Sequence, residues 1–118
     1  MNAYDNSIRY TDNFLARIIH LLKQQQVDAS MLYTSDHGED IFDDGRHLFL
    51  HASPVPSYYQ LHVPLLLWTS DSYREEYPGI EKAASMNRQK NISSSISFFQ
   101  TMMELAGIET PYRNDSLS

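Results

Sequence analysis

The chain has 118 residues, of which 42% are hydrophobic and 20% are charged, and its formal net charge is -6. These values are ordinary for one small globular domain or a piece of a larger one, and they exclude a disordered chain. The negative charge argues against nucleic-acid binding, and the lack of cysteine excludes disulfide scaffolds, thiolate zinc sites and cysteine nucleophiles.

The first predicted element is a helix over residues 5–25. An apolar stripe recurs along it at helical spacing: Leu15, Ile18, Ile19 and Leu22. Asp5 or Asn6 is expected to cap the start of this helix, because short polar side chains accept hydrogen bonds from the first free backbone amides.

A short apolar run, residues 30–35, predicts a buried strand that ends abruptly in the polar residues 36–40. Residues 41–61 contain one glycine and two prolines and have little periodicity. They predict a long loop with one short strand near residues 48–50. A loop of this length in a compact domain is usually functional or flexible.

A second strand is predicted over residues 63–69, with Pro64 near its start because proline cannot donate to a sheet. A polar stretch follows, with a short helix or turn around residues 80–84. The last helix is expected over residues 93–106, with Gly107 as its stop. One face of it carries apolar residues: Ile92, Ile96, Phe99 and Met103. The order helix, strand, loop, strand, helix implies α/β layering.

Asp36 and His37 follow the first predicted strand, and ligands bind beyond the carboxyl ends of strands in open α/β sheets. A carboxylate oxygen and an imidazole nitrogen together suit zinc. Gly38 is expected to let the chain turn sharply, so that both side chains reach one ion. The alternative is a structural turn in which Asp36 accepts hydrogen bonds from backbone amides and His37 is exposed.

Other polar residues lie near this pair in the sequence. His51 could contact an anionic substrate or a second metal, or could simply be solvated. Glu39 is a possible further ligand. Asp40, Asp43 and Asp44 do not match the spacing of an EF-hand calcium loop, so we predict that they are solvated loop residues.

Four segments in order resemble the phosphoethanolamine transferases. They are Tyr-Asp-Asn-Ser-Ile-Arg-Tyr-Thr-Asp (4–12), Tyr-Thr-Ser-Asp-His-Gly-Glu (33–39), Leu-His (50–51) and His-Val-Pro (62–64). The resemblance covers nearly the whole chain. It implies the sulfatase and alkaline phosphatase superfamily, and a partial sulfatase (alkaline phosphatase-like) fold of the α/β class. Residues 1–118 would form the C-terminal portion of a sulfatase-like catalytic domain.

The resemblance also implies an activity for the full-length protein. Such enzymes move phosphoethanolamine from the phospholipid phosphatidylethanolamine to a cell-envelope acceptor such as lipid A, through a phospho-threonine intermediate. One or two zinc ions activate the threonine and neutralise the phosphate. The expected location is the inner membrane, with the catalytic domain facing the periplasm.

Carried over position by position, the resemblance makes Asp36 and His37 zinc ligands. His51 would contact the phosphate or a second zinc. Glu39 occupies the position of the family's glutamate, and the resemblance does not assign it a role. The nucleophilic threonine is expected upstream of this chain. We therefore expect the isolated chain to be inactive, to bind zinc weakly and to self-associate through faces that further elements would cover. No apolar run approaches the ~18 residues of a membrane span, so an anchor is expected outside this chain.

The chain departs from the family pattern in three places. Ala52 stands where a glycine usually follows the histidine, residues 40–45 differ from the common Ser-Leu-Gly-Glu, and residues 93–95 are all serine where many relatives have Ser-His-Asp. The acceptor and the transferred group therefore stay open. One alternative is a sulfatase or phosphoglycerol transferase of the same superfamily, which shares the Asp-His pair. Another is a non-catalytic binding module.

Overall fold

The computed structural model describes residues 3–51 and 53–114. Ala52, the departure that follows His51, lies outside these residues. The side chains of residues 94–96, within the last helix, also lie outside the description.

The first helix, α1, spans Ala3–Gln25 and ends before Gln26, whose φ of 54° is left-handed and cannot continue a helix. The predicted apolar stripe is half-buried along its length, while Phe14 is 55% exposed. The predicted cap is wrong: the helix begins earlier, so Asp5 lies in the first turn. Its negative charge there suits the positive end of the helix dipole.

The two predicted strands are present and pair with one another. β1 (Ser30–Thr34) lies antiparallel to β4 (Leu65–Thr69), in a register that places Ser30 opposite Thr69 and Thr34 opposite Leu65. Pro64 precedes β4, as its missing N–H requires. Because the strands are antiparallel, the end of β1 lies beside the start of β4. The segment after β1 therefore meets the segment before β4.

Three helices follow β4: α3 (Asp71–Glu76), α4 (Gly79–Asn87) and α5 (Ser94–Leu105). Only the middle of α4 was expected between the second strand and the last helix. Ser70 is the N-cap of α3, and its hydroxyl accepts a hydrogen bond from the backbone amide of Tyr73 in the first turn. Gly107 ends α5 as predicted, with a left-handed φ of 64°.

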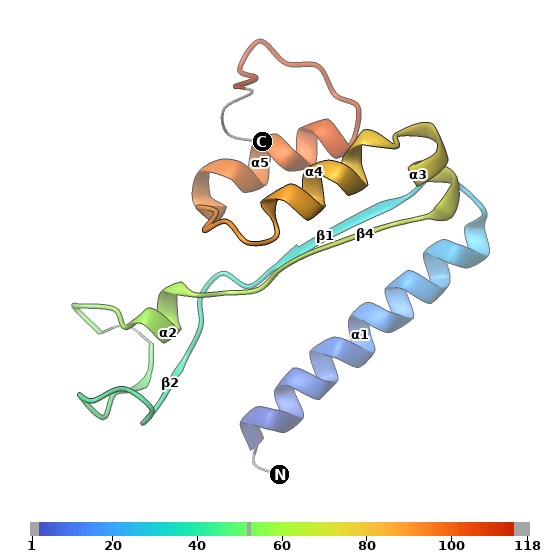
Figure 1. Ribbon diagram of the computed structural model, residues 1–118. Helices are drawn as coiled ribbons and strands as arrows, with labels where there is room; N and C mark the ends of the chain where they lie inside the picture. The colour runs from blue at the N-terminus through green and yellow to red at the C-terminus, as the bar shows by residue number, and fades with distance from the viewer. Residues whose placement is uncertain (1–2, 52, 115–118) are drawn as a thin grey trace.

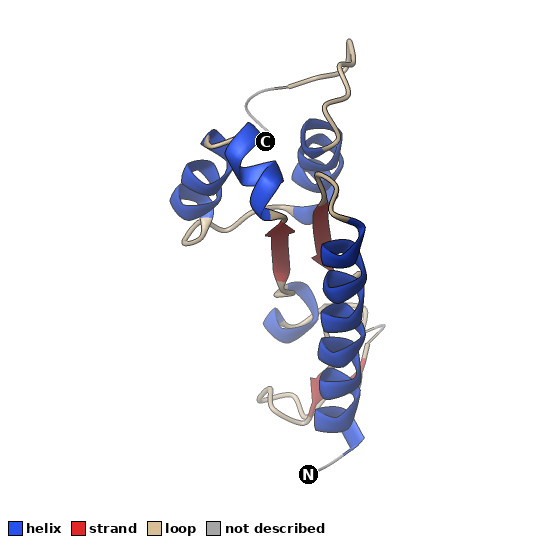
Figure 2. Ribbon diagram, turned by 90° about the vertical axis from the view of Figure 1, so that its right-hand side faces the viewer, coloured by secondary structure: helices blue, strands red, loops and turns tan. Residues whose placement is uncertain are grey.

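Figure 1 shows α4 and α5 on one side of the β1–β4 ribbon and α1 on the other, and Figure 2 shows α1 alongside the strands in a second view. The α/β layering is thus observed.

Tyr73 of α3 is 6% exposed, and its hydroxyl donates to the carbonyl oxygen of Leu105 at 2.7 Å. Burial, and after it the neighbouring Tyr77, raise the pKa of Tyr73 above its ordinary value. Among the described residues, no helix combines the length and the apolar character needed to cross a membrane.

The expected long loop contains more structure than its sequence indicates. β2 (Asp40–Ile41) pairs antiparallel with β3 (Phe49–Leu50), which confirms the short strand predicted near residues 48–50. A short helix, α2 (Tyr58–Leu61), was not expected. Four residues are too few to show helical periodicity, so the hydrophobic pattern carries no signal for it.

Candidate metal centre

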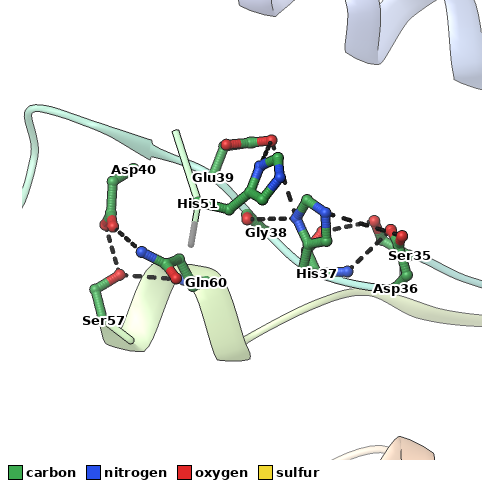
Figure 3. Close-up of polar contacts among 9 residues, drawn as sticks. All are labelled: Ser35, Asp36, His37, Gly38, Glu39, Asp40, His51, Ser57 and Gln60. Atoms are coloured by element: carbon green, nitrogen blue, oxygen red, sulfur yellow. Dashed lines mark hydrogen bonds and ion pairs between the residues drawn. The ribbon is translucent and has the colours of Figure 1, made fainter. Parts of the chain in front are cut away.

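Three side chains converge beyond the end of β1. His37 and Glu39 come from the segment after β1, and His51 follows β3 directly. The register of β2 with β3 places Asp40 opposite Leu50, so the next residues outward, Glu39 and His51, meet. His37, Glu39 and His51 each offer a ligand atom, and these atoms lie within 4.8 Å of one another (Figure 3). We call these three residues the metal cluster.

The carboxylate of Glu39 lies near both imidazoles of the metal cluster. Its Oε1 is 2.8 Å from Nδ1 of His51 and 3.9 Å from Nδ1 of His37. The two rings are adjacent, with centroids 4.1 Å apart and planes tilted by 38°. When Nδ1 of His51 donates to Glu39, Nε2 of His51 carries the free lone pair. The His51 side chain is half exposed, so this nitrogen can reach a ligand.

The second oxygen of Glu39 supports the interpretation as a cation site. Within the described part of the chain, Oε2 of Glu39 is a buried oxygen without a hydrogen-bond partner. An orphaned buried carboxylate oxygen is costly, and a bound cation would satisfy it. One carboxylate with two imidazoles is a donor set that zinc uses. The residues present therefore fit a zinc ion.

His37 has a different neighbour at each ring nitrogen. Nδ1 is 3.0 Å from the carbonyl oxygen of Gly38, and Nε2 is 3.8 Å from Oδ2 of Asp36. When Nδ1 carries the proton, it donates to Gly38, and Nε2 is a free acceptor that faces Asp36. A histidine that binds a metal usually donates its other N–H in this way. His37 therefore lies between Asp36 on one side and the Glu39–His51 pair on the other.

Asp36 is not one of the three residues of the metal cluster. Its side chain is 89% exposed, and its Oδ1 accepts from the backbone amide of His37 at 3.0 Å. That hydrogen bond is the one expected for the structural-turn alternative. The other oxygen, Oδ2, faces the imidazole of His37. The geometry of Asp36 and His37 thus has features of both alternatives: one oxygen of Asp36 forms the structural turn, and the other faces the imidazole of His37.

Gly38 is needed for a reason other than a left-handed turn. Its N–H donates to the carbonyl oxygen of Gln60 at 2.9 Å, and a Cβ at this position would collide with the carbonyl oxygen of Tyr59. The positive φ angles of the described residues lie elsewhere. Glycine therefore allows α2 to approach the metal-site segment closely.

The prediction that Asp40 is a solvated loop residue is wrong. Asp40 is 0% exposed, and its Oδ1 accepts from the hydroxyl of Ser57 at 2.5 Å. Its Oδ2 accepts from the side-chain amide of Gln60. A sequence signal existed, because Ser57 and Gln60 have the spacing of a helix capping box. Here Ser57 caps α2, but the glutamine side chain binds Asp40 instead of turning back to the cap.

The other two acidic residues of the loop lie nearer to solvent. Asp43 is exposed, as predicted, and its carboxylate accepts from the amide of Ile41 at 3.2 Å. Asp44 is half-buried and binds the guanidinium of Arg46 at 2.7 Å. Desolvation acts to raise the pKa of Asp44, but the hydrogen bonds and charge of Arg46 outweigh it, so this pKa lies below its ordinary value.

Comparison with known proteins identifies similar chains. The family described as Sulfatase matches residues 1–108. Phosphoethanolamine transferase EptA of Salmonella typhimurium is 35% identical over 117 residues, which are 95% of this chain and 21% of that protein. The Kdo(2)-lipid A phosphoethanolamine 7''-transferase of Escherichia coli is 28% identical over 116 residues, which are 94% of this chain and 20% of that protein. The chain thus spans about a fifth of the length of these curated relatives.

A solved structure has a similar fold over most of this chain. The crystal structure of the C-terminal periplasmic domain of phosphoethanolamine transferase EptC from Campylobacter jejuni matches with a TM-score of 0.78 and 30% identity. The match covers 94% of this chain and 34% of that one. The predicted partial fold agrees with this likeness.

Proposed function

The chain belongs to the sulfatase family, and from this premise we propose that it supplies zinc ligands to a phosphoethanolamine transferase. The intact protein would take phosphoethanolamine from phosphatidylethanolamine and pass it to a cell-envelope glycolipid such as lipid A. The names of the relatives support this choice of group and acceptor. The similarity to a periplasmic domain supports a catalytic domain on the periplasmic side of the inner membrane.

The observation that carries the proposal is the convergence of Asp36 with the metal cluster around the ring of His37, with Oε2 of Glu39 buried and without a partner in the described part. Asp36 and His37 would bind one zinc ion, with the ring of His37 oriented by the carbonyl oxygen of Gly38. Glu39 and His51 lie on the other side of this ring. They would face the transferred phosphate or a second zinc.

A bound zinc ion would supply positive charge that stabilises the phosphoryl group and activates a nucleophile. The chain's own residues set the direction of its ligands. Glu39 accepts from Nδ1 of His51 and so holds the His51 ring at a fixed angle. Nε2 of His51 then acts as a metal ligand when it is unprotonated, or as a donor to a phosphate oxygen in the imidazolium form.

The test is phosphoethanolamine transfer to lipid A by the intact protein, measured by mass spectrometry of the lipid. We expect His37→Ala to reduce transfer by about 10²–10³-fold, the range for losing one group that stabilises developing charge. His20→Ala is the matched control, because His20 lies on α1, away from the site, and its ring contacts the side chain of its helix neighbour Gln24. Normal transfer by His37→Ala would contradict the ligand assignment. A wild-type protein that cleaves sulfate esters and transfers no phosphoethanolamine would contradict the proposed reaction.

A further inference from the structure

A buried polar cluster lies directly beside the candidate metal centre. It consists of Asp40, Ser57 and Gln60, which are 0%, 3% and 6% exposed, and we call it the Asp40 cluster. Both carboxylate oxygens of Asp40 accept hydrogen bonds, one from the hydroxyl of Ser57 and one from the side-chain amide of Gln60. Both partners are neutral. A buried carboxylate is tolerated only when donors satisfy it, so these bonds strongly constrain where Asp40 can lie.

The Asp40 cluster joins α2 to the segment that carries the candidate ligands. Asp40 binds the side chain of Ser57, which caps α2, and that of Gln60 within α2, and the N–H of Gly38 donates to the backbone oxygen of Gln60 at 2.9 Å. Glu39 is the one residue between these two attachment points. Figure 3 shows the side chain of Asp40 directed toward Ser57 and Gln60, and that of Glu39 directed toward His51.

We infer that Asp40 is a positioning residue for the metal cluster, an inference that rests on the proposed function. With residues 38 and 40 both attached to α2, the backbone of Glu39 has little freedom to rotate. Its carboxylate is therefore held where Oε1 meets Nδ1 of His51 at 2.8 Å. Loss of the carboxylate of Asp40 frees one of the two attachments, and Glu39 then no longer presents a fixed oxygen between the two imidazoles.

The experiment is a Co²⁺ titration of the 118-residue chain, followed by the visible absorption of the bound ion. Asp40→Ala is expected to weaken Co²⁺ binding by about 10-fold or more, the usual effect of losing a group that orients metal ligands. Asp40→Asn is expected to stay within about threefold, because its oxygen accepts from Ser57 and its amide donates to a reoriented Gln60 side chain. Asp12→Ala is the matched control: it removes the same charge from an exposed position on α1 and should leave the affinity unchanged.

If circular dichroism shows that Asp40→Ala is unfolded, Gln60→Met replaces it as the test variant. Gln60→Met removes one donor to Asp40 but leaves the backbone oxygen that binds Gly38, and it is expected to weaken Co²⁺ binding by about fivefold or more. Folded Asp40→Ala with wild-type affinity would overturn the inference. If Asp40→Ala is unfolded, wild-type affinity of Gln60→Met would overturn it.

A readout without metal separates this inference from the proposed function. The proposed function stands or falls with transfer by the intact protein, whereas the ¹⁵N chemical shifts of the His51 ring in the metal-free chain test the positioning role alone. We expect Asp40→Ala, or Gln60→Met if the first is unfolded, to shift Nδ1 of His51 toward the value of a Glu39→Ala chain. An unchanged Nδ1 signal would overturn the inference.

Discussion

Two regions of the molecule are stabilised in different ways. The layer formed by β1, β4, α3 and α5 buries Tyr73, the one large apolar side chain that is buried among the described residues, together with the polar Thr69 and Gln100. The site region, residues 36–60, instead buries polar side chains, and Asp40 is its most buried residue. The layered region thus buries a large aromatic ring, whereas the residues buried in the described part of the site region are all polar and hydrogen-bonded.

This difference has a consequence for function. Hydrogen bonds are directional, so the Asp40 cluster constrains orientation more narrowly than apolar contacts do. The metal cluster lies against this polar region and not against the apolar layer. Substitutions in the two regions should therefore have different effects. Those in the layer should unfold it, and those in residues 36–60 should weaken metal binding while the layer stays folded.

The largest effect on stability is expected for Tyr73→Ala. Replacing a large buried aromatic side chain by alanine costs about 3–5 kcal/mol through lost burial and the cavity that remains. The free energy of unfolding from urea titration measures this loss. Tyr73→Phe is the control, and it should cost only about 1 kcal/mol, because it removes the hydrogen bond to Leu105 and keeps the ring. Equal losses in the two variants would show that the ring is not the source of stability.

Gly38→Ala should have the next largest effect, and in the other region. The added Cβ collides with the backbone oxygen of Tyr59, so α2 must move, at a cost of about 1–3 kcal/mol. We expect zinc binding, measured by calorimetry, to weaken while the helical circular dichroism signal persists. Gly45→Ala adds the same methyl group to open space and should not change zinc binding. Wild-type zinc affinity in Gly38→Ala would break the proposed link between α2 and the site.

A smaller effect is expected for Ser57→Ala. This change removes the cap of α2 and one donor to Asp40, and the loss of such a cap costs about 1 kcal/mol. Amide hydrogen exchange should become faster at Gln60, whose N–H binds the Ser57 hydroxyl, and stay unchanged in β1. Ser53→Ala is the control, because its hydroxyl binds Val55 in the same loop. Faster exchange throughout β1 would show that the two regions are not separable.

The smallest effect concerns the ion pair between the half-buried Asp44 and the exposed Arg46. The pKa of Asp44 is lowered from 3.8, so the stabilisation is present above the unfolded pKa and is lost as the pH falls through the lower, folded pKa. The amide proton of Arg46, which donates to Asp44 at 2.6 Å, should titrate in NMR spectra with a midpoint below 3.8. Arg46→Gln should move this midpoint upward. A wild-type midpoint above 3.8 would contradict the structure of this loop.

The sequence predicted α1, β1, β4 and α5 because their signals are periodic and local, whereas the short helix α3 was missed. The stripe on α1 and the runs of β1 and β4 depend only on side chains that are neighbours along one element. The glycine after α5 is recognised in the same way, from the conformation that a helix stop needs. The agreement is therefore closest in the layered region.

The site region could be predicted only in part. The Asp-His-Gly-Glu motif identified the segment, but Glu39 and His51 meet through the pairing of β2 with β3, and strands of two residues leave no periodic pattern. Asp40 was expected in solvent because acidic loop residues usually lie there. Its burial depends on two donors about twenty residues away, which no local pattern shows.

The central claim is that the ring of His37 connects Asp36 on one side to Glu39 and His51 on the other. A Zn²⁺ titration followed by the ring ¹⁵N signals of the histidines tests it most directly. The account predicts that the signals of His37 and His51 move together, that the His20 signal does not move, and that His37→Ala weakens the zinc affinity reported by the His51 signal. An unchanged zinc affinity at His51 in His37→Ala, or no shift at either residue in the wild-type chain, would contradict it.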